Sequence, residues 1–262
     1  MRITFSGGEA NEHVLDLYSG AESLSGIGRV AALVTHYVST GDVRFRAPYS
    51  DRLEFRLSSL AAGSLTAIIS AASKIPDNIL AAAAKLRAAT LFERVLKRAT
   101  GQAPGEAINL NGMIAPAGDI DVLSEAAIPA LQRVHRWIDQ NGKSIVIVPD
   151  QRPPVTFDGE TREYLEAEEL DANESIQDVS VGALNVNSRT GRVYFHDLGR
   201  TVPFVVPKSA TGRTIVTLAR YLTRYAERAE ASVNIRFRRV KFIDGRLKRI
   251  IISDCYAIAA AA

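Results

Sequence analysis

The stretch VNIRFRRVKFIDGRLKRIIISD, residues 233–254, alternates apolar and polar side chains on both sides of Asp244-Gly245. Alternation with a period of two is typical of strands that bury one face, and an Asp-Gly pair between two such runs is a strong hairpin signal. The sequence therefore predicts two long antiparallel strands that turn at Asp244-Gly245. Seven Arg or Lys and one Asp lie within positions 236–249, so the exposed face of this hairpin is expected to be basic.

Three shorter strand patterns and one helix pattern precede this hairpin. In the first strand pattern, residues 176–188, the apolar parity changes at Gly182, which predicts a glycine bulge that lets one strand bend between two halves of a barrel. The later strand patterns and the helix pattern lie at 193–197, 201–207 and 211–230. Three strands, a helix and two strands form the element order of the OB-fold, a five-stranded barrel, although small SH3-like barrels have similar strand counts.

The first 148 residues carry a different pattern, which predicts an antiparallel sheet with helices. Apolar residues between Leu24 and Val38 recur at helical spacing, and Gly41 is suited to end that helix. Strands are expected at 1–5, 13–18, 42–48, 51–60, 65–71 and 144–148, and helices at 20–41, 78–100 and 124–140. The fold class predicted for the whole chain is therefore α+β, with an OB-like five-stranded barrel and one helix in its C-terminal part.

Charge separates along the chain. Residues 172–262 hold 15 basic and 7 acidic side chains, whereas residues 1–171 hold 17 basic and 22 acidic ones, within a net charge of +3. Such asymmetry, in a chain of 262 residues, indicates two domains with different roles. Between them, residues 149–175 combine a Pro pair, an Asp-Gly pair and part of a carboxylate run that contains no basic residue. The expected organisation is an α+β domain over 1–148, an acidic linker over 149–175 and a barrel domain over 176–262.

Cysteine content and hydropathy indicate the cellular compartment in which the protein is expected. Cys255 is the single cysteine, which excludes an internal disulfide and a multi-cysteine metal site and fits a reducing compartment. Its apolar neighbours favour a small buried side chain over a reactive thiol. No apolar run is long enough to predict a membrane helix, and the first residues lack the pattern of a secretory signal, so a cytoplasmic location is expected.

Motifs for catalysis or cofactor binding are weak throughout the sequence. Residues 26–31 match G-x-G-x-x-A, but the expected neighbours do not form the strand-turn-helix that dinucleotide binding requires. Asp119 and Asp121 bracket a predicted helix start, where capping explains them more simply than metal binding does. The four histidines show no paired ligand spacing. The sequence therefore predicts no catalytic residue, metal or cofactor, and it gives no basis for assigning an enzyme activity.

The chain also resembles a family of uncharacterised two-domain bacterial and prophage proteins. The residues that carry the resemblance are Gly63-Ser64, in a hairpin of the N-terminal domain, together with Asp244-Gly245-Arg246-Leu247 and Ile250-Ile251-Ile252 at the end of the barrel. Such proteins often lie near mobile elements or phage-defence genes. The resemblance implies an accessory role in a phage-defence assembly, and it implies no catalytic residue.

Two functional hypotheses follow for the barrel. In the first, it is a non-enzymatic module that binds single-stranded nucleic acid or an oligonucleotide, with bases stacked on an aromatic ring and phosphates against cations. In the second, it is a structural or accessory subunit that oligomerises and docks a partner with an acidic surface. The candidate binding residues on the exposed face are Arg192, Tyr194, His196, Arg236, Arg238, Lys241, Arg246 and Lys248.

Two further observations bear on these hypotheses. The helix pattern adds Arg220, Arg224 and Arg228 at successive i+4 positions. The carboxylate run between Glu163 and Asp178 provides an alternative, in which it lies against the basic hairpin and neutralises it within the chain or across an oligomer.

Overall fold

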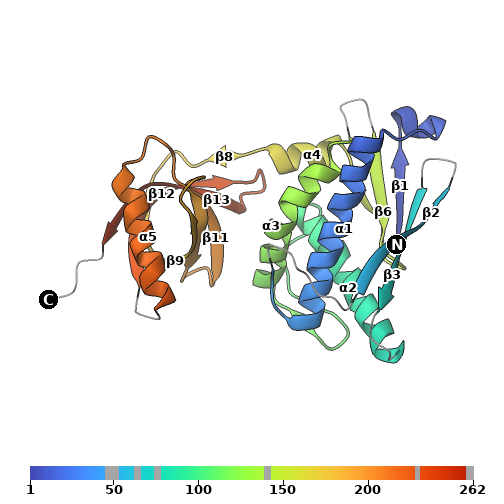
Figure 1. Cartoon of the computed structure of the whole chain (residues 1–262), viewed down its shortest axis with the longest axis horizontal. Helices are drawn as coiled ribbons and strands as arrows, with labels where there is room; N and C mark the ends of the chain where they lie inside the picture. Colours follow the sequence, from blue (N-terminus) through green and yellow to red (C-terminus); the bar gives the residue numbers. More distant parts are fainter. Residues whose placement is uncertain (45–52, 62–65, 74–77, 139–142, 228–230, 258–262) are drawn as a thin grey trace. The chain divides into compact units, whose positions relative to one another are not determined.

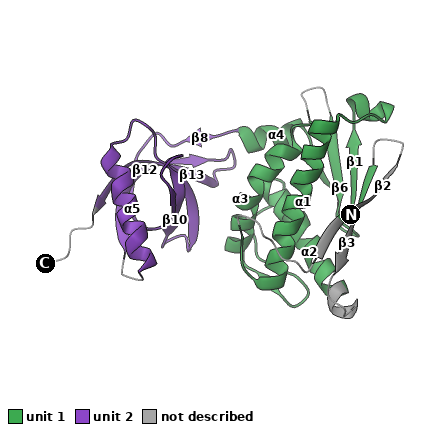
Figure 2. Cartoon of the chain, viewed as in Figure 1, with its two compact units in different colours: residues 1–166 green, residues 167–262 purple. Residues whose placement is uncertain are grey.

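The computed structural model describes residues 1–44, 53–61, 66–73, 78–138, 143–227 and 231–257 (Figure 1). The chain divides into two units, residues 1–166 and 167–262 (Figure 2), and each unit has its own hydrophobic core. Both units combine strands with helices, which confirms the α+β class. Most of the strand expected at 42–48, together with Gly63-Ser64, Gly142 and Arg228, lies outside the described residues.

The sheet of unit 1 is antiparallel throughout, with strand order β2-β3-β1-β6-β7. Its strands are β1 (Arg2–Ser6), β2 (Leu53–Ala61), β3 (Thr66–Ser73), β6 (Ser144–Val148) and β7 (Val155–Phe157). Alternate residues of β1, β6 and β7 are buried, so one face of the sheet lies on the core. The single tryptophan, Trp137, is in that core and meets the ring of Phe5 edge to face, with centroids 5.1 Å apart.

Helices pack against this buried face of the sheet (Figure 1). They are α1 (Leu17–Thr40), α2 (Asn78–Ala99), α3 (Ala117–Val134) and the short α4 (Gly159–Glu166). The smaller elements of the unit are a 3-10 helix (Gly8–Glu12) and the strand pair β4 (Ile108–Asn109) and β5 (Ile114–Ala115).

The ends of α1 test the local predictions for this helix. Gly41 follows the helix with a φ of 78°, which confirms its role as a C-cap. The strand expected at 13–18 is wrong, because the side chain of Asp16 accepts a hydrogen bond from the Ser19 amide and starts α1 at Leu17. An N-cap carboxylate thus overrides a short apolar alternation.

The glycine motif at residues 26–31 lies inside α1, and it serves the packing of helices. Gly26 is buried, and a Cβ built at this position would lie 2.5 Å from the carbonyl oxygen of Ala130 in α3. One turn earlier, the Ser23 hydroxyl donates to the Val134 carbonyl at 2.8 Å. The glycine therefore permits a close crossing of α1 and α3, and the turn that a dinucleotide site requires is absent from these residues.

The stretch expected to be a linker contributes to both units. Residues 149–166 include β7 and α4 of unit 1, where Val155, Phe157 and Leu165 are buried. His135, the C-cap residue of α3, contacts Thr161 of α4, with 3.0 Å between Nε2 and Oγ1, and burial lowers the pKa of this imidazole. A few apolar side chains among prolines and carboxylates thus attach this segment to the core. The composition of the stretch, averaged over its length, does not reveal them.

Unit 2 is a closed barrel of five strands with one helix, as predicted. Its elements are β8 (Glu169–Leu170), β9 (Ser175–Asn185), β10 (Thr190–Phe195), β11 (Arg200–Val205), α5 (Gly212–Ala226), β12 (Ser232–Lys241) and β13 (Leu247–Ala257). The ring runs β9-β10-β11-β13-β12 and returns to β9, and the short β8 adds to β12. Within the described part of the barrel, β11 and β13 are the one pair of strands that run in parallel. This is an OB-like arrangement.

Two glycines shape the wall of the barrel. Arg192 pairs with Ala183 and Val193 pairs with Val181, so Gly182 is the extra residue of a bulge, as predicted. Because of this bend, β9 pairs with β12 through its first half and with β10 through its second half. At Gly191 the strands approach so closely that a Cβ would lie 2.1 Å from the Ala183 carbonyl oxygen.

Candidate functional site

The outer face of β10 carries three polar side chains in one row. Val193 and Phe195 point into the barrel and are 0% and 1% exposed, whereas Arg192 and Tyr194 alternate with them on the outside. His196 follows directly and is exposed. The rings of Tyr194 and His196 meet edge to face, with centroids 5.3 Å apart. We call Arg192, Tyr194 and His196 the β10 platform.

Neighbouring strands hold this platform in place. The Nε atom of Arg192 donates to Thr201 Oγ1, and its Nη2 atom donates to the Thr201 carbonyl oxygen; both distances are 3.2 Å. The guanidinium therefore lies along β11. Tyr194 stands opposite Thr201 on one side and Ser180 on the other. The Nε2 atom of His196 lies 3.3 Å from Ser180 Oγ. Both side chains opposite the tyrosine are small, and Tyr194 itself is half-buried.

Two loops of the barrel correspond to those that flank the ligand face in other OB barrels. In OB barrels the loops after the first and the fourth strand flank the ligand face of the second and third strands. Here these loops are residues 186–189 and 242–246, and each has an exposed aliphatic side chain, Val186 at 57% and Ile243 at 54%. The first loop is fixed by Arg189, whose guanidinium donates to the carbonyl oxygens of Val206 and Ala210.

The cations of the β12–β13 hairpin have partners of their own. An acidic strap, residues 168–174, runs beside β12, and its β8 residues pair with Val240 and Lys241. We call the four cations that face this strap the basic ribbon. The ion pairs are Lys241–Asp171 at 2.6 Å, Lys248–Glu168 at 3.1 Å, Arg249–Glu168 at 2.6 Å and Arg236–Glu174 at 3.9 Å. The structure thus supports the alternative in which the carboxylate run neutralises the hairpin.

The strap is charged at neutral pH. Burial raises the pKa of Glu168, but hydrogen bonds from Arg249 and Lys248 outweigh it and hold this pKa below its ordinary value. The backbone adds a second attachment, because the Asp171 amide donates to the Arg239 carbonyl at 2.9 Å.

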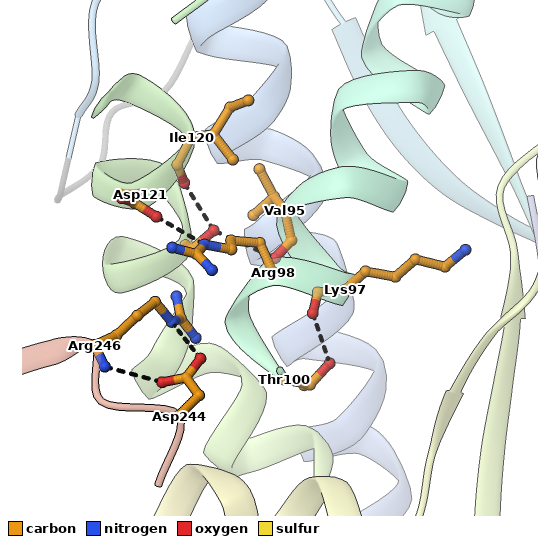
Figure 3. A network of polar contacts seen from close by, with 9 residues as sticks. Val95, Lys97, Arg98, Thr100, Ile120, Asp121, Asp244 and Arg246 are labelled. Carbon is orange, nitrogen blue, oxygen red and sulfur yellow. Dashed lines mark hydrogen bonds and ion pairs between the residues drawn. The ribbon is translucent and has the colours of Figure 1, made fainter. Parts of the chain in front are cut away.

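The remaining hairpin cations differ from one another. Arg246 contacts Asp244 of the same turn, with 2.9 Å between Nε and Oδ2 (Figure 3), and its guanidinium lies over the ring of Phe242. Arg239 donates to Ser175 and lies over Phe237. Arg238 is exposed and has no ion pair or side-chain hydrogen bond within the described part of the chain. Of the eight candidate residues, three form the platform, three belong to the ribbon, Arg246 lies in the hairpin turn, and Arg238 stands apart on β12.

Groups elsewhere that resemble reactive or metal-binding sites have structural partners. Asp121 pairs with Arg98 at 2.8 Å (Figure 3), and Asp119 accepts a hydrogen bond from the buried Tyr37 hydroxyl. Burial raises the pKa of the Cys255 thiol to about 12, so this thiol stays protonated at neutral pH. Among the described residues, no three His, Cys, Asp or Glu side chains gather as a metal site.

Sequence reasoning missed Thr201, which positions Arg192 of the platform, and Arg189, which fixes the loop before β10. The signal for Thr201 was present, because the short turn between β10 and β11 places position 201 opposite position 194. Nothing local indicates the contacts of Arg189, which reach carbonyl oxygens 17 and 21 residues away.

The fold and this surface define a two-domain α+β protein with an OB-like barrel. The model of a domain of unknown function, DUF7946, matches residues 1–166, and that of a family of unknown function, DUF7947, matches residues 174–256. The first match covers more than half of the chain, so the chain belongs to the DUF7946 family, and the resemblance to a two-domain family is confirmed.

Searches of curated proteins and of solved structures found no match to the chain. None of the helices in the described residues combines the length and the apolar content needed to cross a membrane.

Proposed function

We propose that the barrel unit is a non-enzymatic module that binds single-stranded nucleic acid or an oligonucleotide through the β10 platform. One observation carries the proposal: a cation, a phenol ring and an imidazole lie in one row on the outer face of the second strand of an OB-like barrel. Stacking of a base on such a ring contributes about 1–3 kcal/mol, and it tolerates any base because every base has a π-face.

Each platform residue has a distinct role in this proposal. Tyr194 supplies the stacking surface, and the edge-to-face contact with His196 orients its ring. Arg192 is anchored along β11 by Thr201 and provides positive charge beside that ring, where a phosphate of the stacked nucleotide would lie. Val186 and Ile243 on the flanking loops offer apolar contacts to sugars and bases.

The ribbon has a smaller part in binding than its charge indicates. Arg236, Lys241 and Lys248 already face carboxylates of the strap, so a phosphate would have to replace those partners. We therefore assign the ribbon mainly to holding the strap, and the proposal depends on the platform.

A filter-binding titration of the full chain with DNA and RNA single strands of about 20 nucleotides tests this function. Binding is expected in the micromolar range at about 50 mM salt, and it should weaken at least about tenfold at 200 mM salt. Tyr194→Ala should weaken it by a further factor of about 5–150, the equivalent of 1–3 kcal/mol, whereas Tyr194→Phe should retain binding.

Tyr256→Ala is the matched control for this titration. Tyr256 is an exposed tyrosine of the same barrel on β13, where it contacts Arg236. Its removal should leave the affinity almost unchanged. Absence of binding at micromolar protein and low salt would contradict the function, and equal losses in Tyr194→Ala and Tyr256→Ala would contradict the platform as its site.

A second candidate function is favoured by the strap itself. The ribbon already binds an acidic peptide, residues 168–174, so its chemistry also suits the acidic surface of a protein partner. In this alternative the chain is an accessory subunit of a larger assembly, for which the family resemblance suggests phage defence. Light scattering that reveals a defined homo-oligomer, together with indifference to nucleic acid, would support it.

A further inference from the structure

The outer face of α5 presents a line of arginines. Arg213, Arg220 and Arg224 are exposed, whereas the opposite side of the helix buries Thr214, Ile215, Leu218 and Tyr221 in the barrel unit. At about 100° per residue, the spacings of seven and four positions keep the three arginines within roughly 40° around the axis. They extend along about 16 Å of the helix, at 1.5 Å per residue. We call these three residues the α5 stripe.

No carboxylate neutralises this stripe within the described part of the chain. Arg213 and Arg220 have neither an ion pair nor a side-chain hydrogen bond there, and Arg224 contacts only the ring of Tyr221, 5.4 Å from its centroid. Lys208, exposed in the loop before the helix, likewise lacks a carboxylate partner among the described residues. Like charges at i and i+4 disfavour a helix slightly, so the stability of α5 does not explain why Arg220 and Arg224 lie together.

The segments before and after the α5 helix contact residues at the two ends of the platform strand. At the start of β10, Arg189 donates to the Ala210 carbonyl, directly before the N-cap residue Thr211. At the end of β10, the Nε2 atom of His196 lies 3.5 Å from Ser232 Oγ, at the first residue of the strand that follows α5. Residues two positions before α5 and six positions after it therefore lie beside the two ends of β10.

We propose that the α5 stripe binds the sugar-phosphate backbone of the nucleic acid whose bases the platform holds. This inference rests on the proposed function and adds a second contact region to it. The planar guanidinium matches phosphate oxygens in a two-pronged fork and stays charged at every relevant pH. Since the strap neutralises the ribbon, the stripe supplies the sequence-independent electrostatic part of binding, and the platform supplies base stacking.

The variant R213Q/R220Q tests the stripe against a control of equal charge change, R2Q/K85Q. Arg2 and Lys85 are exposed in unit 1 and have no ion pair within the described residues. Arg224 is left in place because its contact with Tyr221 supports packing. For a single-stranded 20-mer, R213Q/R220Q should weaken binding about tenfold at 50 mM salt and reduce the slope of log K against log salt by about 1.4. R2Q/K85Q should leave that slope unchanged, and R213K/R220K should restore it.

The outcomes separate this inference from the proposed function. Tyr194→Ala removes no charge, so it should lower the affinity with an unchanged salt slope.

If the unaltered chain binds nucleic acid but R213Q/R220Q and R2Q/K85Q have the same slope, the stripe proposal is wrong and the platform stands. If R213Q/R220Q weakens binding of polyglutamate as much as that of DNA, the partner is an acidic protein and the inference fails. If the unaltered chain binds no nucleic acid, both proposals fail. Far-UV circular dichroism verifies that α5 is retained.

Discussion

The basic ribbon on β12–β13 and the α5 stripe carry the same kind of charge on one small barrel, but their surroundings differ. The ribbon faces three carboxylates of the strap, whereas the stripe faces none among the described residues. The denser of the two clusters in the sequence is therefore the one that the fold neutralises. A run of basic residues indicates a polyanion site only when the positions of the carboxylates in space are known.

The contacts of the strap also indicate what holds it in place. Ion pairs between partly exposed side chains contribute about 0–1 kcal/mol each, so they set the surface potential more than the stability. The pairing of β8 with β12 and the bond from the Asp171 amide to Arg239 provide the more specific attachment.

The largest effect is expected for Gly191→Ala, which destabilises the barrel that carries both surfaces. The new Cβ would lie 2.1 Å from the Ala183 carbonyl oxygen and 2.5 Å from the ring of Phe204. The first of these clashes is with backbone, which moves less easily than a flexible side chain. We expect a loss of about 3 kcal/mol or more in the stability of unit 2. Hydrogen exchange of the β9–β11 amides measures it. Gly212→Ala is the control, because no atom lies within 4 Å of its new Cβ, and its exchange should stay as in the unaltered chain.

The next largest effect is expected when the strap carboxylates that neutralise the ribbon are removed. The triple variant E168Q/D171N/E174Q frees the ribbon cations, so nucleic-acid affinity at low salt should rise about tenfold and the salt slope should steepen by about 2. The control E12Q/E160Q/E163Q makes the same charge change at exposed carboxylates of unit 1 that form no ion pair among the described residues. Equal affinity in both variants would mean that total charge, and not the strap, governs binding.

A smaller effect is expected when acid titrates the strap. The pKa of Glu168 lies below the ordinary 4.5, so its ion pairs contribute fully above that pH and are lost as the pH falls through the lower folded-state value. Amides of residues 167–174 should exchange faster, after correction for intrinsic rates, between about pH 5 and pH 3. Glu168→Gln should weaken this dependence, and Glu163→Gln should preserve it. A dependence that survives Glu168→Gln in full would assign the effect to other carboxylates.

The smallest effect is expected at Arg238, an exposed cation of β12 that has no ion pair or side-chain hydrogen bond among the described residues. Arg238→Gln should change the free energy of unfolding by no more than about 0.5 kcal/mol. Lys241→Gln removes the partner of Asp171 and should cost up to about 1 kcal/mol. Urea unfolding of unit 2, followed by hydrogen exchange, compares the two. A larger loss in Arg238→Gln would show that its charge is engaged in the fold.

The difference between ribbon and stripe also shows how far the sequence could predict this molecule. The hairpin at Asp244-Gly245, the bulge at Gly182 and the end of α1 at Gly41 follow from local backbone preferences, and the structure confirms them. The strap could not be predicted in this way, because Lys241 and Asp171 are 70 residues apart and no local signal sets their register. Composition suggested only that the carboxylates were able to reach the hairpin.

The same limit applies to residues 149–166. Their prolines and carboxylates are typical of a linker, but Val155 and Phe157 lie on β7, an edge strand of the unit 1 sheet, with their side chains turned to the core and 0% exposed. Two apolar side chains at a spacing of two are too weak a pattern to detect without the sheet that receives them.

The burial of Trp137 in unit 1 has a practical consequence. It is the only indole in the protein, it meets Phe5 edge to face, and Lys143 lies over its ring. Intrinsic fluorescence excited at the red edge of the absorption band therefore reports on the first unit alone and is silent about the barrel. Loss of one unit can thus be distinguished optically from loss of the other without attaching any dye.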